Sequence, residues 1–541
     1  MKILILGIDG GSWEIINMGV SENKLPTFKY LIENGVHGTL RSTIPPRTLP
    51  AVPSFITGKN PGKVGIDAFL DGKTGRVMSS LDIRESALWD ILSRHSLRCC
   101  VVGVPLTYPA KEINGVMISG PPLPSSDCDF TWPRELKSEI DYPVESAGRE
   151  GLEETVRSKG VGYLFDKYRD ITKKSLDIFK ELVAKRDYDF SIFFVKGSDI
   201  LQHFLWEEKQ LLLEYHQIID IFLKEMLDSG GYDLVFIISD HGFERESEYF
   251  HINTWLEKER YLFVKKPIRL LHNLYRRLEH APRLRALALK GLALFNFLLR
   301  SKRGKTLQAV MEGKKRVDDL FEESGGAVFG VDMSKSIAWS QRGYGIEIKP
   351  TLEAAKYHQV REEIIKKLSE LKINGKKIVR MVKRREEEYT GNYINRFPDI
   401  IILTEEGIVP RVSLAKQVVV VPKHRIRTGQ HDSAVNGIFI ACGNSIKKGA
   451  ETEKARIYDI APTILHAFGL PIPKDMDGRV LKEIFTEGSE LAQRKVKYQE
   501  ISVERERQRI KERIRKTKES GRLNQTGEHD MKRAEKDTKR Q

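Results

Sequence analysis

The chain has 541 residues, of which 40% are hydrophobic and 30% are charged, with a formal net charge of +15. This is the composition of a soluble globular protein whose length exceeds one typical domain. The sequence contains no apolar stretch of about 20 residues, so no membrane-spanning helix is predicted. The first apolar run is too short for a secretion signal. The four cysteines form no zinc motif or disulfide framework and fit a reducing cytoplasm: Cys99, Cys100, Cys128 and Cys442.

Strands and helices alternate in the first segment, residues 1–243. Its predicted strands are nearly continuous apolar runs rich in β-branched residues, as buried parallel strands are: KILILGI, RCCVVGVP, GVMISG, FSIFFVK and LVFIIS. Helical patterns lie between them, such as SALWDILSRH and the stretch 200–227. The alternation predicts an α/β core with a mostly parallel sheet flanked by helices.

A helical, basic insert is predicted over residues 244–327. Its central part, 266–305, is leucine-rich with helical spacing, and Pro282 is expected to split it into two helices. We favour an insert that packs its leucines on the core. The alternative is a lid, or a surface that rests on anionic lipid.

Strand character returns in residues 328–490, the second part of the core. The predicted strands are KSIAWS, GIEIKP, KIVRMV, DIIILT, QVVVVP and GIFIACG, and a helical unit follows over 457–468. The tail, 491–541, is predicted to be a solvated helix that grades into disorder. From Arg494 onward it has 17 Lys/Arg and 9 Asp/Glu, which contributes +8 of the net charge. No specific nucleic-acid partner is predicted, and the sequence indicates no oligomeric state.

Three predicted strands each lead into an aspartate: Asp9, Asp199 and Asp240. In an open α/β sheet the ligand crevice lies outside the carboxyl ends of the strands, so we expect these carboxylates to meet there. A histidine follows two of them. His203 lies four residues after Asp199, on the same face of a predicted helix, and His241 directly follows Asp240. Carboxylates with imidazoles are ligands of first-row metals, so the pattern indicates a metal centre.

Two further residues belong near this pattern. Adjacent Asp240 and His241 can reach one centre only in irregular backbone, and we expect Gly242 to supply that freedom. His431 lies much later, in TGQHDSAVNG, just before another predicted strand.

Thr48 is the candidate nucleophile, in TLPAVPSFITG. Pro50 suits the first turn of a helix, so Thr48 is expected to be its N-cap. A helix N-terminus also stabilises anions such as phosphate, and a bound cation would make the hydroxyl nucleophilic. The capping and nucleophilic roles are compatible.

These motifs together resemble the type I phosphodiesterase/nucleotide pyrophosphatase family of the alkaline phosphatase superfamily. The matching pieces run in order along nearly the whole chain before the tail: GIDGG, TLPAVPSFITGKNPGKVGI, SDILQHFLW, SDHGF, GQH and YDIAPTILHAFGLPIPKDMDGRVL. The resemblance implies an alkaline-phosphatase-like core and hydrolysis of anionic phosphate esters.

The resemblance also implies two divalent metal ions, Zn²⁺ or alternatively Mn²⁺. One ion would be held by Asp199, His203 and His431. The other would be held by the second group of ligands, Asp9, Asp240, His241 and the Thr48 oxygen. Thr48 would attack phosphorus and form a phosphothreonine intermediate, which metal-activated water then hydrolyses. The two ions, about 4 Å apart, would clamp the attacking and leaving oxygens.

The chain departs from the family pattern at two positions. Phe69 stands where nucleotide pyrophosphatases carry an asparagine that helps to hold a phosphoryl oxygen, and Val64 replaces their usual histidine. Both changes weaken the case for nucleotide diesters. A sulfatase is discounted, because Thr43 begins the Thr-Ile-Pro-Pro-Arg run where sulfatases need Cys or Ser.

We therefore expect a metal-dependent phosphodiesterase-like hydrolase. Alternatives on the same fold are a phosphomonoesterase, a phosphonate hydrolase or a phosphoglycerate mutase-like enzyme. A non-catalytic scaffold that docks to membrane or nucleic acid through the insert and tail is a different class. The complete set of predicted ligands argues against it.

Overall fold

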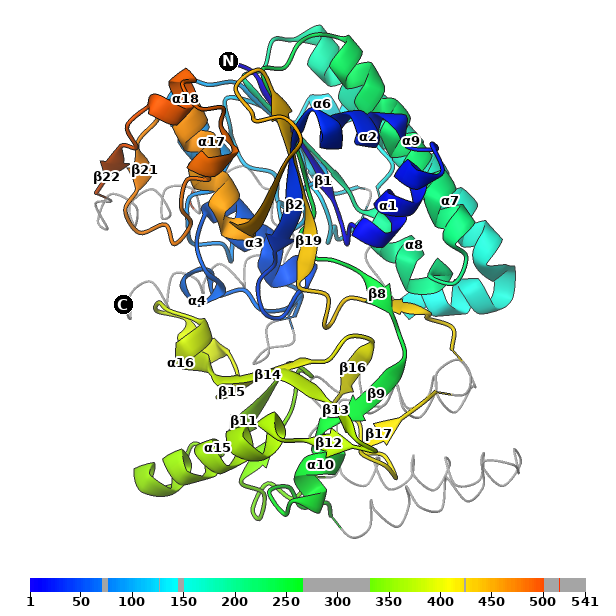
Figure 1. Ribbon diagram of the computed structural model, residues 1–541, viewed down its shortest axis with the longest axis vertical. Coiled ribbons are helices and arrows are strands. Elements are labelled where there is room, and N and C mark those ends of the chain that lie inside the picture. Colours follow the sequence, from blue (N-terminus) through cyan, green and yellow to red (C-terminus); the bar gives the residue numbers. More distant parts are fainter. Residues whose placement is uncertain are drawn as a thin grey trace.

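The computed structural model describes residues 1–70, 76–125, 127–144, 150–265, 331–422, 425–500 and 515. They form two lobes (Figure 1). The larger lobe is built from two parts of the chain, one before and one after the residues that form the smaller lobe. Residues 266–327 of the predicted insert lie outside the described residues, as does the predicted tail except for residues 491–500 and 515. The predicted start of the tail at 491 is wrong, because Leu491 is buried in the core of the larger lobe and β22 (Tyr498–Gln499) pairs with β21 (Ile472–Pro473).

The larger lobe is organised around one sheet, which within the described residues has nine strands. Strands β7, β1, β6, β3 and β4 are parallel neighbours, whereas β19 runs antiparallel between β2 and β7. This confirms the predicted mostly parallel sheet. In sheet order the strands are β20 (Ala450–Arg456), β2 (Gly35–Arg41), β19 (Asn436–Gly443), β7 (Leu234–Ile238), β1 (Ile3–Ile8), β6 (Phe190–Val195), β3 (Cys99–Val102), β4 (Gly115–Ile118) and β5 (Thr131–Trp132).

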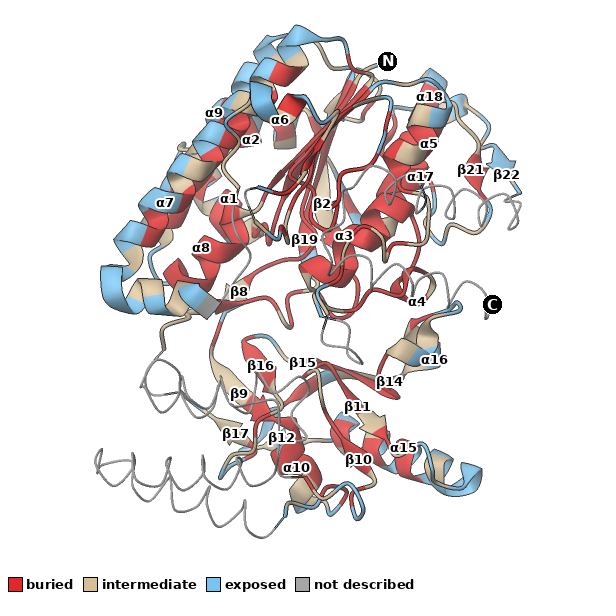
Figure 2. Ribbon diagram, turned by 180° about the vertical axis from the view of Figure 1, so that it is seen from behind, coloured by how far each residue is buried: buried red, intermediate tan, exposed pale blue. Residues whose placement is uncertain are grey.

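Helices cover both faces of this sheet, which explains why its strands are apolar on both sides. Ile3 and Ile5 of β1 face one core, and Leu4 and Leu6 face the other. The first core is closed by α3 (Thr48–Thr57), α4 (Pro61–Val64), α5 (Leu88–Arg94) and α17 (Ile460–Ala467). The second is closed by α1 (Trp13–Ser21), α2 (Pro26–Glu33), α7 (Glu150–Lys185), α8 (Gly197–Leu205) and α9 (Lys209–Asp228). Figure 2 shows the buried strands between helices with exposed outer faces.

The smaller lobe is inserted between β7 and β19. The chain enters it through β8 (Glu244–Arg245) and leaves through β18 (Gly429–Gln430), and these two strands pair antiparallel. Inside the lobe, one sheet has the order β10 (Ala338–Trp339), β11 (Gly345–Ile348), β15 (Ile400–Thr404) and β14 (Val379–Arg384), with α15 (Ala354–Ser369) packed beside it. A second sheet has the order β16 (Ile408–Arg411), β9 (Glu248–His251) and β17 (Val419–Val420).

The predicted start of the helical insert at residue 244 is wrong. Residues 244–251 form β8 and β9, and only then does α10 (Ile252–Lys258) begin. The apolar side chains of β9 and α10 pack into the core of the smaller lobe. Helical periodicity alone did not reveal these strands, because β8 has only two residues and its partner is far along the chain. Among the described helices, none is both long and apolar enough to cross a membrane.

The smaller lobe rests on the segment that carries Thr48. Tyr389 Oη donates a hydrogen bond to the Ile44 carbonyl oxygen over 2.5 Å. Arg342 forms an ion pair with Asp67, and Tyr344 Oη donates to the same carboxylate over 2.7 Å. These contacts join the smaller lobe to residues on either side of Thr48 in the sequence.

Candidate metal centre

The three predicted aspartates meet beyond the carboxyl ends of β1, β6 and β7. Asp9 follows β1, Asp240 lies two residues after β7, and Asp199 lies in the first turn of α8. The parallel register brings Gly7 beside Ile238, so the two strands end at the same level. All three side chains are at least 98% buried, because each is 2% exposed or less. The expected meeting of strand-end carboxylates thus occurs.

The first group of ligand atoms consists of Asp199, His203 and His431. Their ligand atoms all lie within 4.8 Å of one another. His203 Nε2 is 3.4 Å and His431 Nε2 is 3.6 Å from Asp199 Oδ1. The predicted four-residue spacing of Asp199 and His203 is realised on one helix, α8.

The second group consists of Asp9, Asp240 and His241, again with ligand atoms within 4.8 Å of one another. His241 Nε2 is 3.4 Å from both Asp9 Oδ1 and Asp240 Oδ2. The two groups are neighbours, because the rings of His241 and His431 lie with their centroids 4.2 Å apart.

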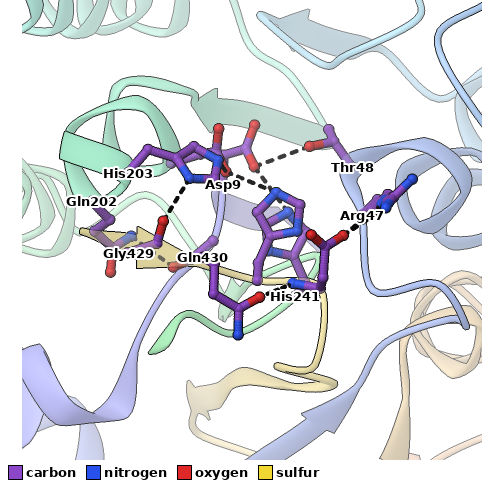
Figure 3. A network of polar contacts seen from close by, with 12 residues as sticks. Asp9, Arg47, Thr48, Gln202, His203, His241, Gly429 and Gln430 are labelled. Carbon is purple, nitrogen blue, oxygen red and sulfur yellow. Dashed lines mark hydrogen bonds and ion pairs between the residues drawn. The ribbon is translucent and has the colours of Figure 1, made fainter. Parts of the chain in front are cut away.

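Backbone carbonyl oxygens orient all three imidazoles, and Figure 3 shows the contact between His203 and Gly429. The Nδ1 atoms of His203, His241 and His431 lie 3.0, 3.0 and 2.9 Å from the carbonyl oxygens of Gly429, Gly242 and Pro46. A carbonyl oxygen can only accept, so each Nδ1 carries a hydrogen, and each Nε2 is the atom that can offer a lone pair to a cation once it is deprotonated. Metal-binding histidines are held in this way.

The donor set fits a pair of divalent ions. Among the described residues, Asp240 Oδ2 and His241 Nε2 are buried and make no hydrogen bond. Buried polar atoms are costly to leave unsatisfied, and a cation would satisfy both. Imidazole nitrogen with carboxylate oxygen suits Zn²⁺ and similar first-row ions.

The pKa values of the second group also favour bound cations. Burial, and then the Asp240 and Asp199 carboxylates, raise the pKa of Asp9 to about 8. Burial opposes the charged form of His241, but Asp240 and Asp9 outweigh it and raise the pKa of His241 to about 10. The cluster of carboxylates therefore requires positive charge, from protons or from metal ions.

Removal of the metal should make stability fall as pH rises. Because the folded-state pKa values of Asp9 and His241 lie above their unfolded values, the metal-free folded protein binds protons more tightly than the unfolded chain. The resulting stability is lost as pH rises through about 8 for Asp9 and about 10 for His241. We expect the chelated protein to have a lower Tm at pH 9 than at pH 6.5.

Zinc should change this dependence, because zinc competes with protons and binds more tightly at high pH. The gain in Tm on adding zinc is therefore expected to be larger at pH 9 than at pH 6.5. Thermal scans of chelated and zinc-loaded protein at both pH values measure it. An equal gain at both values would contradict this electrostatic explanation.

Thr48 lies beside the second group. Its Oγ1 donates to Asp9 Oδ1 over 3.2 Å, and the side chain is buried. The expected capping role is wrong, because no side chain caps α3 and the Thr48 hydroxyl contacts Asp9 instead. Leu49 has non-helical φ and ψ of −110° and 110°, so regular helix begins only after it. Pro50 thus lies at the start of the regular turn, and Thr48 precedes it.

Gly242 is needed for space rather than for an unusual φ. A Cβ at this position would collide with the carbonyl oxygen of Asn436 on β19, and the Gly242 N–H donates to Ala434 over 2.9 Å. We expect Gly242→Ala to lower the free energy of unfolding by about 1–3 kcal/mol, the usual cost of overpacking. Urea unfolding measures it. Gly162→Ala is the matched control, since a Cβ there meets nothing within 4 Å. An equal effect of both substitutions would contradict the prediction.

Two charged residues at the site were not predicted as functional. Arg47 Nε and Nη2 donate to Asp432 Oδ1 over 2.9 and 2.7 Å. Partial burial of Asp432 opposes its charged form, but the Arg47 guanidinium outweighs this effect and lowers the pKa of Asp432. Each residue adjoins a predicted site residue, Thr48 or His431, and this adjacency was the available signal.

The two departures from the family pattern both contact the core of the larger lobe. Val64 is buried at the end of α4, and Phe69 packs partly buried against the core beneath it. A phenyl ring at position 69 cannot donate a hydrogen bond to a phosphoryl oxygen, as an asparagine would.

Known proteins share this fold. The sequence model of type I phosphodiesterase/nucleotide pyrophosphatase matches residues 3–433. Phosphonoacetate hydrolase from Sinorhizobium meliloti 1021, in complex with phosphonoformate, is 13% identical with a TM-score of 0.50, covering 85% of this chain and 94% of the hydrolase. Human ectonucleotide pyrophosphatase/phosphodiesterase 5 is 14% identical with a TM-score of 0.48, covering 90% of this chain and 100% of that chain. No curated protein matches the chain. At such identity the hydrolase shows a common alkaline-phosphatase-like fold.

Proposed function

We propose that this chain, which belongs to the type I phosphodiesterase/nucleotide pyrophosphatase family of the alkaline phosphatase superfamily, hydrolyses phosphate esters at a two-metal site with Thr48 as nucleophile. Because the chain belongs to this family, it is a metal-dependent phosphoric ester hydrolase. The observation that carries the finer proposal is the hydrogen bond of the Thr48 hydroxyl to Asp9 over 3.2 Å, because Asp9 belongs to one of two adjoining groups of buried ligand atoms.

Zn²⁺ is the proposed ion in both groups, with Mn²⁺ as the alternative. Asp199, His203 and His431 would hold one ion. Asp9, Asp240, His241 and the Thr48 oxygen would hold the other. When bound, the ions supply positive charge that lowers the pKa of the Thr48 hydroxyl and neutralises the phosphoryl oxygens.

The chain's own residues then account for the order of events. Asp9 accepts the hydrogen bond of the Thr48 hydroxyl and so orients it. Thr48 Oγ1 gives up its proton and attacks phosphorus, the bond from phosphorus to the leaving oxygen breaks, and that oxygen takes up one proton, which balances the one released by Thr48. Water then attacks the phosphothreonine, releases the phosphate product and restores the Thr48 hydroxyl.

An anionic phosphate ester is the proposed substrate. Phe69 offers no hydrogen bond to a phosphoryl oxygen, so this site lacks one contact expected of a nucleotide diesterase. The phosphonoacetate hydrolase was solved with a small phosphonate, which shows what that relative binds. For this chain, a comparison of the hydrolysis of a diester with that of a monoester decides which substrate class it prefers.

Hydrolysis of bis-p-nitrophenyl phosphate and of p-nitrophenyl phosphate by zinc-loaded protein tests the proposal, with Thr48→Ala as control. Diester turnover that vanishes in the variant supports a phosphodiesterase that uses Thr48. Preference for the monoester would make the enzyme a phosphomonoesterase. Undiminished turnover in Thr48→Ala would refute the nucleophile.

A further inference from the structure

The backbone around Thr48 is irregular on both sides. Arg47 has φ and ψ of −134° and 152°, and Leu49 has −110° and 110°, so both neighbours are extended. The hydrogen-bond pattern of a continuous helix therefore does not set the direction of the Thr48 side chain. Contacts from elsewhere in the fold have to set it.

Three hydrogen bonds join this segment to the loop that carries His431. Asp432 Oδ1 accepts from Arg47 Nε over 2.9 Å and from Arg47 Nη2 over 2.7 Å. One residue back on each side, His431 Nδ1 donates to the Pro46 carbonyl oxygen over 2.9 Å. The residues before Thr48 are thus attached to a candidate ligand of the first metal group and to its neighbour. Figure 3 shows Arg47 next to Thr48.

The loop itself is held firmly, so it serves as a fixed reference. The Asp432 N–H donates to Gln430 Oε1 over 2.5 Å, and Gln430 Nε2 donates to Ser433 Oγ over 2.8 Å. Glu244, where the chain enters the smaller lobe, accepts hydrogen bonds from both Gln430 and Ser433. Side chains within the loop and from β8 therefore brace the carboxylate that receives Arg47.

The ion pair is partly shielded from water. The side chains of Arg47 and Asp432 are 27% and 21% exposed. Two charge-assisted bonds from one guanidinium fix its direction as well as its distance, which an exposed single contact does not. The remaining Arg47 nitrogen, Nη1, faces the Arg342 carbonyl oxygen at 3.5 Å.

We propose that Asp432 is a positioning residue, which through Arg47 holds Thr48 in line for attack beside the metal group that includes His431. This inference rests on the proposed function of Thr48. Small displacements of a reacting group cost about 10²-fold in rate, so loss of the pair should act on the chemical step rather than on substrate binding.

The experiment compares Asp432→Ala, Arg47→Ala and the double variant, each zinc-loaded, on the better p-nitrophenyl substrate. We expect each single variant to lower kcat by about 10²-fold with KM unchanged. The double variant should be no slower than the slower single variant, because both remove the same interaction. Asp432→Asn and Arg47→Lys, which keep part of the bonding, should recover part of kcat.

A binding measurement accompanies the kinetics. Vanadate takes five oxygen ligands and so resembles phosphorus during attack by a hydroxyl. Asp432→Ala should weaken vanadate binding by the same factor as kcat, and should retain two zinc ions per chain and the Tm of the parent. Asp82→Ala is the matched control, because Asp82 pairs with Arg76 at similar exposure, 17% and 24%. It should change neither kcat nor vanadate affinity.

Three results would overturn the inference: unchanged kcat in both single variants, a raised KM in Arg47→Ala alone, or loss of zinc from Asp432→Ala. A raised KM would make Arg47 a substrate-binding residue, and zinc loss would make Asp432 a support for His431. Thr48→Ala separates this from failure of the proposed function. If Thr48→Ala keeps turnover and vanadate affinity, Thr48 is not the nucleophile and the proposed function fails. If it loses both while the Asp432 variants do not, only the positioning role fails.

Discussion

Thr48→Ala is expected to lower turnover of the phosphate ester by at least about 10³-fold, as loss of a nucleophile does in other hydrolases. The residue supplies the hydroxyl that lies 3.2 Å from Asp9, a member of the second metal group. Both metal ions should remain, because six ligands other than Thr48 are untouched. Steady-state kinetics measure turnover, and atomic spectrometry of the same sample measures zinc per chain.

Thr57→Ala is the matched control for this variant. Thr57 lies in the same helix, is fully buried, and donates to the Pro53 carbonyl oxygen over 2.7 Å. Its loss should reduce stability and leave kcat unchanged. Thr48→Ser, which retains a hydroxyl, should retain part of the activity. If Thr48→Ala turned over substrate with two zinc ions bound, water or another nucleophile would have to attack phosphorus directly, without a phosphothreonine.

Asp240→Asn is expected to reduce the metal content from two ions per chain to one and to abolish turnover. The substitution keeps the shape of the side chain. Its Oδ1 can still accept from the Gly10 N–H, now at 3.1 Å, but the amide nitrogen at the other position has no lone pair for a cation. Metal affinity of the second group should fall by more than the roughly 10–100-fold typical of losing a residue that only supports a ligand.

Zinc titration by calorimetry measures this loss, and Asp220→Asn is its control. Asp220 is also buried, but it accepts hydrogen bonds from the backbone N–H groups of Thr27 and Phe28 and lies outside both metal groups. That variant should lose stability and keep two tightly bound ions. Two tightly bound ions in Asp240→Asn would show that Asp240 is no ligand.

The sequence predicted the carboxylate part of the site well, for a physical reason. Strand-end aspartates converge because neighbouring parallel strands keep register. Gly7 lies beside Ile238, so Asp9 and Asp240 emerge at one edge. Asp199 and His203 converge because one helical turn separates them. Both relations are local or follow from sheet geometry, and periodicity reveals both.

Relations between distant segments were harder to predict. His431 could be assigned only through the family resemblance, because the whole smaller lobe separates it from His241. The Arg47–Asp432 ion pair joins residues 385 positions apart, and no spacing rule reports such a contact. For Thr48, local preference favoured a cap, but the hydrogen bond to Asp9 and the extended Leu49 prevailed. The insert boundary failed because β8 forms only when it pairs with β18.

Anomalous X-ray scattering at the zinc edge from crystals of the zinc-loaded protein tests the central claim most directly. Two peaks are expected beyond the carboxyl ends of β1, β6 and β7. One should lie among Asp199, His203 and His431, and the other among Asp9, Asp240 and His241 with Thr48 alongside. A single peak, or zinc bound anywhere other than these two groups, would contradict the two-metal site and the role proposed for Thr48.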